Sequence, residues 1–312
     1  MSHHLVETID LCFSYPDSPP ALNGVSLRIT HGESVAVVGG NGAGKSTLLL
    51  HLNGLLTPSS GQVRVGDIPV TPKTVARVRE SVGMVFQQAE DQLFMPTVRE
   101  DVAFGPLNMG LPPEEIRRRV EQALRDVHAE ALADKMTHHL SGGEKRAVSI
   151  ATVLSMSPDI LVLDEPVDGL DPVMRRQVWS LLMGDVADHG TTVLVSSHNL
   201  RELEDVCDHV GILSRGKVLI ERSLSALQEN VVKMQVVFQE KELPQLPGDL
   251  QVLHVSQVGR IHTLIIRGNA TEITNRLAAF APILMEALPL TLEEIFIYEL
   301  GGADYAVKDI VL

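Results

Sequence analysis

The stretch Gly39-Gly-Asn-Gly-Ala-Gly-Lys-Ser-Thr47 decides the fold of this 312-residue chain. It matches the pattern G-x-x-x-x-G-K-[ST] and lies between the apolar run Ser34–Val38, which predicts a buried strand, and residues 45–56, which predict a helix. The glycines let successive backbone N–H groups point inward around an anion, and the start of the helix adds a favourable dipole. A strand, a glycine-rich loop and a helix in this order predict a loop that cradles phosphate groups, whereas a chance lysine in a glycine-rich turn is the alternative.

The expected ligands of this loop are ATP and Mg²⁺. Lys45 is expected to neutralise charge on the β- and γ-phosphates, and the Ser46 hydroxyl is expected to bind Mg²⁺. Other loop residues are expected to surround the phosphates, and they are Gly39, Asn41, Gly42, Gly44 and Thr47.

A second motif pairs two carboxylates with this loop. The apolar run Ile160–Leu163 predicts a buried strand, and Asp164 and Glu165 follow it directly. Asp164 is expected to serve the metal, while Glu165 lies beside the γ-phosphate, where a carboxylate orients and deprotonates water. An acidic pair after an apolar strand is by itself often only a strand end, and the phosphate loop favours the catalytic interpretation.

The third motif, Leu140-Ser-Gly-Gly-Glu144, precedes a predicted helix. Ser141, Gly142 and Gly143 form an anion site at the start of that helix. One chain cannot usefully aim two such sites at one γ-phosphate, so we expect a two-fold pair in which the Ser141 turn of each subunit closes the ATP of the other. An isolated five-residue motif of this kind is also an ordinary helix cap.

Strands and helices alternate along the first two thirds of the chain, which predicts an α/β fold with a parallel sheet covered on both faces. The pattern changes near Glu221. Beyond it the expected elements are strands at 231–238, 250–256, 260–267 and 282–287 and helices at 271–280 and 291–300. They predict a small α+β accessory domain, with a ferredoxin-like arrangement as one candidate.

These motifs, in this order, resemble those of the nucleotide-binding subunit of an ABC transporter. The resemblance covers residues 4–222 and implies a P-loop NTPase of ABC type with a parallel-sheet core, an antiparallel β subdomain and a helical subdomain at about 88–157. Residues 231–312 then form the accessory domain. The resemblance also implies ATP hydrolysis coupled to transport.

The resemblance adds four residues to the site. Tyr15 should stack on adenine, Gln87 should reach Mg²⁺ and the attacking water, and His198 should contact the γ-phosphate. The plainer alternatives are that Tyr15 is a half-buried edge residue, that Gln87 is a solvated loop amide and that His198 is a helix-entry residue. Asp171 belongs to the same set, and because Pro172 follows it, it also makes a good helix N-cap.

Two positions depart from the pattern of the family. Gly40 stands where many relatives carry proline, which should loosen the entry to the loop without removing a phosphate contact. Glu144 stands where glutamine is commoner, a variant familiar in one subgroup.

Two segments point to different branches of the family. Residues 85–94 and 97–108 resemble the energy-coupling-factor ATPases that serve cobalt, nickel and vitamin uptake. This stretch should line the groove for a coupling helix of the membrane partner, and a plain subdomain core is the alternative; its apolar residues are Leu93, Phe94, Met95 and Phe104.

The other segments resemble the ATPases of multidrug or bacteriocin exporters. They are Val195–Glu204, Cys207-Asp208 and Thr291–Phe296. A natural mosaic, a divergent lineage or a recombined chain would all produce this pattern. We weight the groove more heavily because it meets the permease.

Composition limits the partners. The formal net charge is −14 and no run of Lys and Arg marks a nucleic-acid footprint, which argues against nucleic acid. The apolar runs are of strand length, so membrane work falls to a permease or a T-type coupling subunit, and this chain is expected at the cytoplasmic face of the membrane. A second ATPase subunit, this chain or a paralogue, completes the assembly. A soluble non-transport ABC protein and a non-hydrolysing nucleotide binder are the remaining alternatives.

Overall fold

The computed structural model describes residues 4–204, 206–229, 231–240 and 242–294. Contacts divide the chain into two compact units. The main unit consists of the residues up to His198 together with His209–Glu221, and the accessory unit consists of Asn199–Asp208 and the residues from Arg222 onward. The chain therefore enters the accessory unit directly after His198 and returns to the main unit before it enters the accessory unit again.

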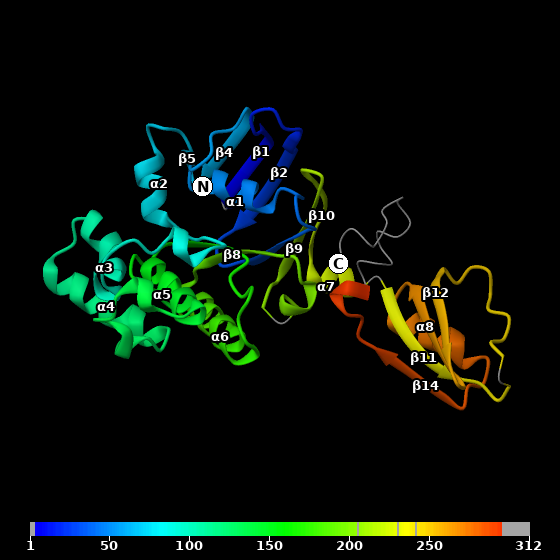
Figure 1. The fold of residues 1–312 in the computed structure, drawn as a ribbon. Helices are drawn as coiled ribbons and strands as arrows, with labels where there is room; N and C mark the ends of the chain where they lie inside the picture. Colours follow the sequence, from blue (N-terminus) through cyan, green and yellow to red (C-terminus); the bar gives the residue numbers. More distant parts are fainter. Residues whose placement is uncertain (1–3, 205, 230, 241, 295–312) are drawn as a thin grey trace. The chain divides into compact units, whose positions relative to one another are not determined.

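The main unit is built on a six-stranded sheet with the strand order β10-β9-β3-β8-β7-β6 (Figure 1). Strand β3 is parallel to β8 and β9, and β7 is parallel to β6 and β8. Every residue of β3, β7 and β8 is buried, as expected for strands with both faces covered. The predicted parallel-sheet core is confirmed, and its strands are β3 (Ser34–Val38), β6 (Val82–Val85), β7 (Ile160–Asp164), β8 (Thr192–Ser197), β9 (His209–Ser214) and β10 (Lys217–Ser223).

A second, antiparallel sheet has the strand order β2-β1-β4-β5. Buried residues of this sheet join one hydrophobic core with helix α1 (Lys45–Leu52), whose Leu48, Leu49 and Leu52 are fully buried. Helix α2 (Val75–Ser81) precedes β6. The strands of this sheet are β1 (His4–Ser14), β2 (Pro20–Thr30), β4 (Ser60–Val65) and β5 (Ile68–Pro69).

The helical subdomain packs around its own core, to which Val102, Leu124 and Val148 contribute. Helices α3 and α5 both begin with a capping box, in which the N-cap hydroxyl and the glutamate three residues later bond to each other's backbone N–H. The helices are α3 (Val98–Asn108), α4 (Pro113–Asp126) and α5 (Gly142–Leu154), with short 3₁₀ turns at Ala89–Asp91, Glu130–Leu132 and Thr137–His139.

Helix α4 ends at Asp126. His128 takes a left-handed backbone conformation with φ of 55°, which a continuing helix does not allow. Helix α6 (Pro172–His189) follows β7, and the Asp171 carboxylate caps it by accepting from Val173 N at 2.9 Å and from Met174 N at 3.1 Å. Asp171 therefore acts as the N-cap.

The accessory unit contains a four-stranded antiparallel sheet with the order β12-β13-β11-β14. This is the strand order of a ferredoxin-like sheet, with a crossover helix after β13 and a loop in place of the helix after β11. Its elements are α7 (Leu224–Glu229), β11 (Val231–Val237), β12 (Val252–Val258), β13 (Ile261–Arg267), α8 (Ala270–Ala278) and β14 (Leu284–Leu288).

The segment that follows His198 is fastened to residues near the end of the described chain. A 3₁₀ turn at Leu200–Glu202 opens it. Arg201 Nη2 lies 2.7 Å from Glu293 Oε2, and the carboxylate of Glu204 accepts from Leu292 N. Of the helix expected at 291–300, the residues from 295 onward lie outside the described part.

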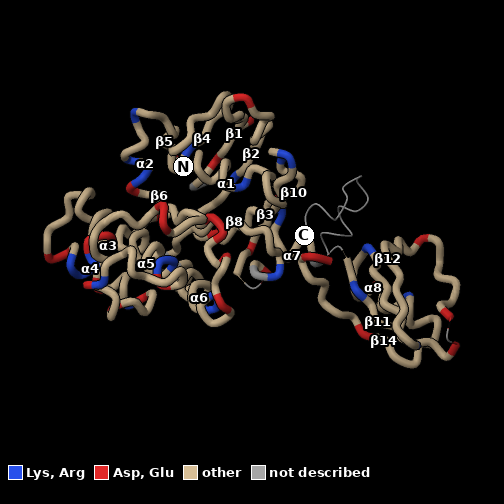
Figure 2. The backbone as a smooth tube through the Cα atoms, viewed as in Figure 1, with Lys and Arg blue, Asp and Glu red and all other residues tan. Residues whose placement is uncertain are grey.

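Lys and Arg are dispersed along the described backbone and do not gather in one stripe (Figure 2). None of the described helices is both long enough and apolar enough to cross a membrane.

Candidate functional site

The phosphate loop connects β3 to α1, and two of its positions require glycine. Gly44 has φ of 105°, and a Cβ there would approach the backbone oxygen of Ala21 to 2.5 Å. A Cβ on Gly39 would approach the backbone oxygen of Leu213 to 2.3 Å. Residues with a side chain would therefore displace the loop, so the sequence pattern has a steric cause at both positions.

Lys45 bends back over this loop and is only 6% exposed. Its Nζ donates to the backbone oxygens of Gly39 at 2.8 Å and of Gly40 at 3.4 Å. It also lies 3.3 Å from Glu165 Oε1. The ammonium group is thus held at the mouth of the loop by two carbonyls and one carboxylate.

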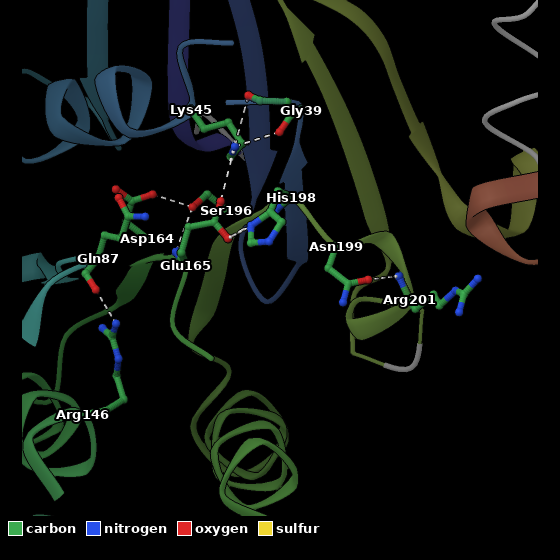
Figure 3. A network of polar contacts seen from close by, with 11 residues as sticks. Gly39, Lys45, Gln87, Arg146, Asp164, Glu165, Ser196, His198, Asn199 and Arg201 are labelled. Carbon is green, nitrogen blue, oxygen red and sulfur yellow. Dashed lines mark hydrogen bonds and ion pairs between the residues drawn. The ribbon is translucent and has the colours of Figure 1, made fainter. Parts of the chain in front are cut away.

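Glu165 is at the centre of the site (Figure 3). It follows β7, is 5% exposed and adopts a left-handed φ of 47°. Its Oε2 lies 2.9 Å from His198 Nδ1 and accepts from His198 N at 3.3 Å. Such a conformation costs of order 1–3 kcal/mol, and residues that keep it cluster at functional sites. The structure therefore brings together Lys45, Glu165 and His198 from three separate elements.

Ser196 on β8 holds both carboxylate residues in place, and sequence reasoning missed it. Its Oγ donates to Asp164 Oδ1 at 2.5 Å and accepts from Glu165 N at 3.0 Å. Because β7 and β8 are parallel neighbours with Asp164 opposite Ser196, the register alone brings these groups together. A polar residue in an apolar strand, two positions before the histidine, was the available signal.

We expect Ser196→Ala to lower ATP turnover about tenfold, because residues that orient ligating carboxylates typically contribute that much or more. Ser155→Ala is the matched control, since its hydroxyl is also buried and donates a hydrogen bond, in this case to the backbone oxygen of Val102 at 2.8 Å inside the helical subdomain. Both variants should lose about 1–3 kcal/mol of unfolding free energy, measured by denaturant titration. Equal turnover in the two variants would rule out the positioning role of Ser196.

A cavity of about 390 Å³ opens over the phosphate loop. It is lined by residues 41–47 of the loop, by Tyr15, Gln87 and Glu165, and by residues 18–21. Tyr15 is 41% exposed, and its hydroxyl lies 3.3 Å from Thr47 Oγ1. The predicted adenine-stacking residue therefore lies on the wall of the same cavity as the predicted phosphate ligands.

His51 and Tyr15 pack on the same aromatic ring, that of Phe13. The ring of Phe13 stands edge-on to both neighbours, with centroids 4.9 Å from Tyr15 and 4.8 Å from His51. His51 Nδ1 lies 2.6 Å from the backbone oxygen of Thr47, and burial lowers the pKa of this imidazole, which favours its neutral form. The sequence offered no signal for this aromatic stack.

Arg146 connects the helix of the Ser141 motif to Gln87. The guanidinium donates to the backbone oxygen of Phe86 at 2.6 Å and to that of Gln87 (Figure 3). Burial lowers the pKa of Arg146, while nearby Asp168, Glu90 and Asp164 favour its charge. The buried guanidinium of Arg146 thus links the backbone at Phe86 and Gln87 to α5.

Ser141, Gly142 and Gly143 start α5 and do not line the cavity over the phosphate loop, and neither does Asp171. Apart from the chain neighbours and the nearby backbone of α5 itself, no described atom lies within 4 Å of a Cβ built on Gly142 or Gly143, so this turn presents an open surface. The Ser141 hydroxyl accepts from Glu144 N at 3.3 Å as part of the capping box. The roles expected for these residues stay predictions.

The residues predicted to serve Mg²⁺ offer oxygen donors. Ser46 and Gln87 line the cavity, and the Asp164 carboxylate is buried next to Glu165. Hydroxyl, amide and carboxylate oxygens are what Mg²⁺ prefers, and it takes few protein ligands when phosphate oxygens are present. The donor set fits the metal.

Comparisons with known proteins agree with this geometry. The family model described as ABC transporter matches residues 22–168. A Geobacter sulfurreducens protein, provisionally named an ABC transporter ATP-binding protein, is 60% identical over 218 residues, which is 70% of this chain and 86% of the relative. The energy-coupling factor transporter ATP-binding protein EcfA of Methanocaldococcus jannaschii is 47% identical over 220 residues, which is 70% of this chain and 78% of the relative.

Solved structures show the same fold. The cbiO1 protein of Clostridium perfringens, described as part of the ABC transporter complex cbiONQ, superposes with a TM-score of 0.65 at 40% identity, over 71% of this chain and 89% of that chain. An ATP-binding cassette in a dimeric post-hydrolysis state, bound to ADP and Pi, has a TM-score of 0.65 at 28% identity, over 70% of this chain and 98% of that chain.

Proposed function

Because the chain belongs to the ATP-binding ATPase subunits of ABC transporters, we propose that it drives uptake of a metal ion or a vitamin as part of an energy-coupling-factor transporter. The similarity to EcfA over most of that protein's length carries this proposal. Such a role places the chain at the cytoplasmic face of the membrane, next to a T-type coupling subunit. Co-purification with that subunit, as opposed to an exporter permease, is the direct test.

The proposed chemistry starts from Lys45. Its Nζ is shared between Glu165 and two loop carbonyls, so a γ-phosphate arriving in the loop competes for the ammonium. Glu165 then keeps the contact with His198 and is available to accept a proton from water. Gln87, which lines the same cavity, would orient that water. Ser46, Gln87 and Asp164 are the residues that would hold Mg²⁺, which would supply positive charge to the transferred phosphate group.

The open turn at Ser141 supports a two-fold pair. Ser141 and Gly142 are exposed at the start of a 13-residue helix, and Ser141, Gly142 and Gly143 lie outside the cavity of their own chain. We propose that they close the ATP site of a second ATPase subunit, with Asp171 beside the shared interface. ATP would then hold the two subunits together.

Of the four apolar residues expected to line the groove, Phe94 and Phe104 are exposed, whereas Leu93 and Met95 are half-buried. Leu93 packs against the core of the helical subdomain, so the plain core alternative holds for this residue. Phe94 is 62% exposed and packs edge-to-face on Phe104 with centroids 4.8 Å apart, and Leu107, one turn further along α3, is 56% exposed. We name Phe94, Phe104 and Leu107 the coupling patch and propose that it receives the coupling helix of the membrane partner.

We expect Phe94→Glu to abolish stimulation of ATP turnover by the T-type subunit and to leave ATP binding intact. A helix in a groove depends on a few apolar anchors, and the loss of one typically costs at least about 2 kcal/mol, or roughly thirtyfold in affinity. A pull-down with the T-type subunit, together with calorimetric titration of ATP, measures both effects.

Leu93→Ala is the matched control, because it removes an apolar side chain one position away that packs on the core. It should lower the melting temperature and leave the affinity for the partner nearly unchanged. A collapsed melt for Phe94→Glu would mean that Phe94 is part of the core. An unchanged pull-down would mean that the importer assignment rests on the wrong segment.

The second candidate function is an exporter ATPase. Its support is the resemblance of Val195–Glu204, Cys207-Asp208 and Thr291–Phe296 to exporter ATPases. Arg201 and Glu293, from two of these segments, form an ion pair. Under this alternative the chain co-purifies with an exporter permease and the coupling patch receives a helix of that permease.

A further inference from the structure

The turn at Ser141 carries a carboxylate at the place where an anion is expected. Glu144 is the third residue of α5, and its Oε2 accepts from Ser141 N at 2.7 Å. The carboxylate therefore lies at the open end of the helix, beside the donors of Ser141, Gly142 and Gly143. An unpaired negative charge at this position would repel a phosphate group that approached the same turn.

Lys135 occupies the other side of this carboxylate. Its Nζ donates to Glu144 Oε1 at 2.9 Å and to Oε2 at 3.2 Å. The two side chains are about one third exposed, at 36% and 31%. The Ser141 N–H and the Lys135 ammonium together lower the pKa of Glu144 to about 2, so the carboxylate is charged throughout the physiological pH range.

The position of Lys135 is set by the backbone around it. Its carbonyl accepts from Val98 N at 3.1 Å, and its own N–H donates to Leu132 O at 2.8 Å. The next residue pairs with Thr97 in a β-bridge. The lysine is therefore anchored to the start of α3 and presented to the start of α5.

Other cations near the turn have different partners. Lys145 forms an ion pair with Glu90 at 2.9 Å, and Arg146 donates to the carbonyls of Phe86 and Gln87. Within the described residues, Glu144 forms its ion pair with Lys135.

We propose that Lys135 is a positioning residue whose charge allows a carboxylate to stand in this turn, so that the turn can still bind the nucleoside triphosphate held by a second copy of this chain. The inference rests on the two-fold pair of the proposed function. It adds a specific electrostatic dependence, because the ammonium cancels the charge of Glu144 and leaves the backbone and hydroxyl donors of the turn to attract the γ-phosphate.

The test measures ATP-dependent association in a Glu165→Gln background, in which slow hydrolysis preserves the bound state. Analytical ultracentrifugation at about 0.1 M salt gives the Mg-ATP concentration at half-maximal dimerisation. We expect Lys135→Met to raise that concentration about tenfold or more, because it exposes the phosphate to an uncompensated charge within a few ångströms. Adding Glu144→Gln to Lys135→Met should restore association, and Lys135→Arg should retain it.

Two controls separate charge from structure. Lys145→Met removes a cation next to the same turn and should shift the half-maximal concentration by no more than about twofold, as expected for a surface pair. The defect of Lys135→Met should shrink at about 1 M salt, because the pair is partly exposed and screened. A purely structural defect would not respond to salt or to Glu144→Gln.

The experiment distinguishes a failure of the proposed two-fold pair from a failure of the role of Lys135. If the parent variant shows no ATP-dependent association of this chain with itself, the two-fold pair and the role of Lys135 both fail. If the parent associates and Lys135→Met associates at the same ATP concentration, only the role of Lys135 is overturned. That role is also overturned if Glu144→Gln gives no rescue.

Discussion

Replacing Glu165 with glutamine is expected to lower ATP turnover by roughly 10²–10⁴-fold, the usual worth of a positioned general base. The amide keeps nearly the size of the carboxylate but cannot take a proton from water. Glu165 also contacts both the Lys45 ammonium and the His198 imidazole, and no other described carboxylate contacts both groups. A steady-state phosphate-release assay measures the loss.

ATP should remain bound in this variant and should hold the subunits together, since occupied sites that cannot be cleared stabilise the pair. Size-exclusion chromatography with and without Mg-ATP detects the shift. Glu90→Gln is a suitable control, because Glu90 is an exposed carboxylate paired with Lys145 outside the cavity. Normal hydrolysis by Glu165→Gln, or a monomer with bound nucleotide, would refute the assignment.

Replacing Lys45 with alanine is expected to weaken ATP binding itself, by about 10–100-fold, which is what a hydrogen bond between charged groups contributes. The loop amides would remain, but the ammonium that now bridges Gly39 O and Glu165 would be lost. Calorimetric titration of ATP measures the affinity. Retained micromolar binding would show that the loop amides, and not this lysine, supply most of the attraction.

Lys45→Ala also leaves Glu165 without its lysine partner, and this predicts a second, separable effect. The pair is nearly buried, with 7% and 6% of the side chains exposed, and removing one partner of such a pair is destabilising. The double variant with Glu165→Gln should therefore recover stability in denaturant titration but not ATP affinity. This difference separates the structural role of the lysine from its role at the phosphates.

The parts of the fold that depend on local pattern could be predicted from the sequence. The phosphate loop, the apolar strands β3, β7 and β8, and the capping residues Ser141 and Asp171 all have short-range signals. The strands of the accessory unit could be placed for the same reason. Their order could not, because it depends on pairing between segments far apart in the chain.

The residues that escaped prediction act through tertiary contacts. Ser196 bonds to Asp164 on the neighbouring strand, and Arg146 bonds to Gln87, which is 59 residues away in the sequence. Lys135 bonds to Glu144 but lies outside the helix that contains Glu144. Leu93 and Phe94 are neighbours of similar hydropathy, yet one packs on the core and the other is exposed. No periodicity distinguishes two adjacent residues in an irregular loop.

The segment after His198 limits which parts of this chain can be exchanged with those of a related protein. The segments that resemble exporter ATPases are far apart in the sequence, yet Arg201 pairs with Glu293, 92 residues later, and Glu204 accepts from the backbone of Leu292. A recombination event that replaced one segment alone would leave unmatched charges. The two segments are therefore coupled in the structure, and a graft of this accessory unit onto another cassette should include Asn199–Asp208.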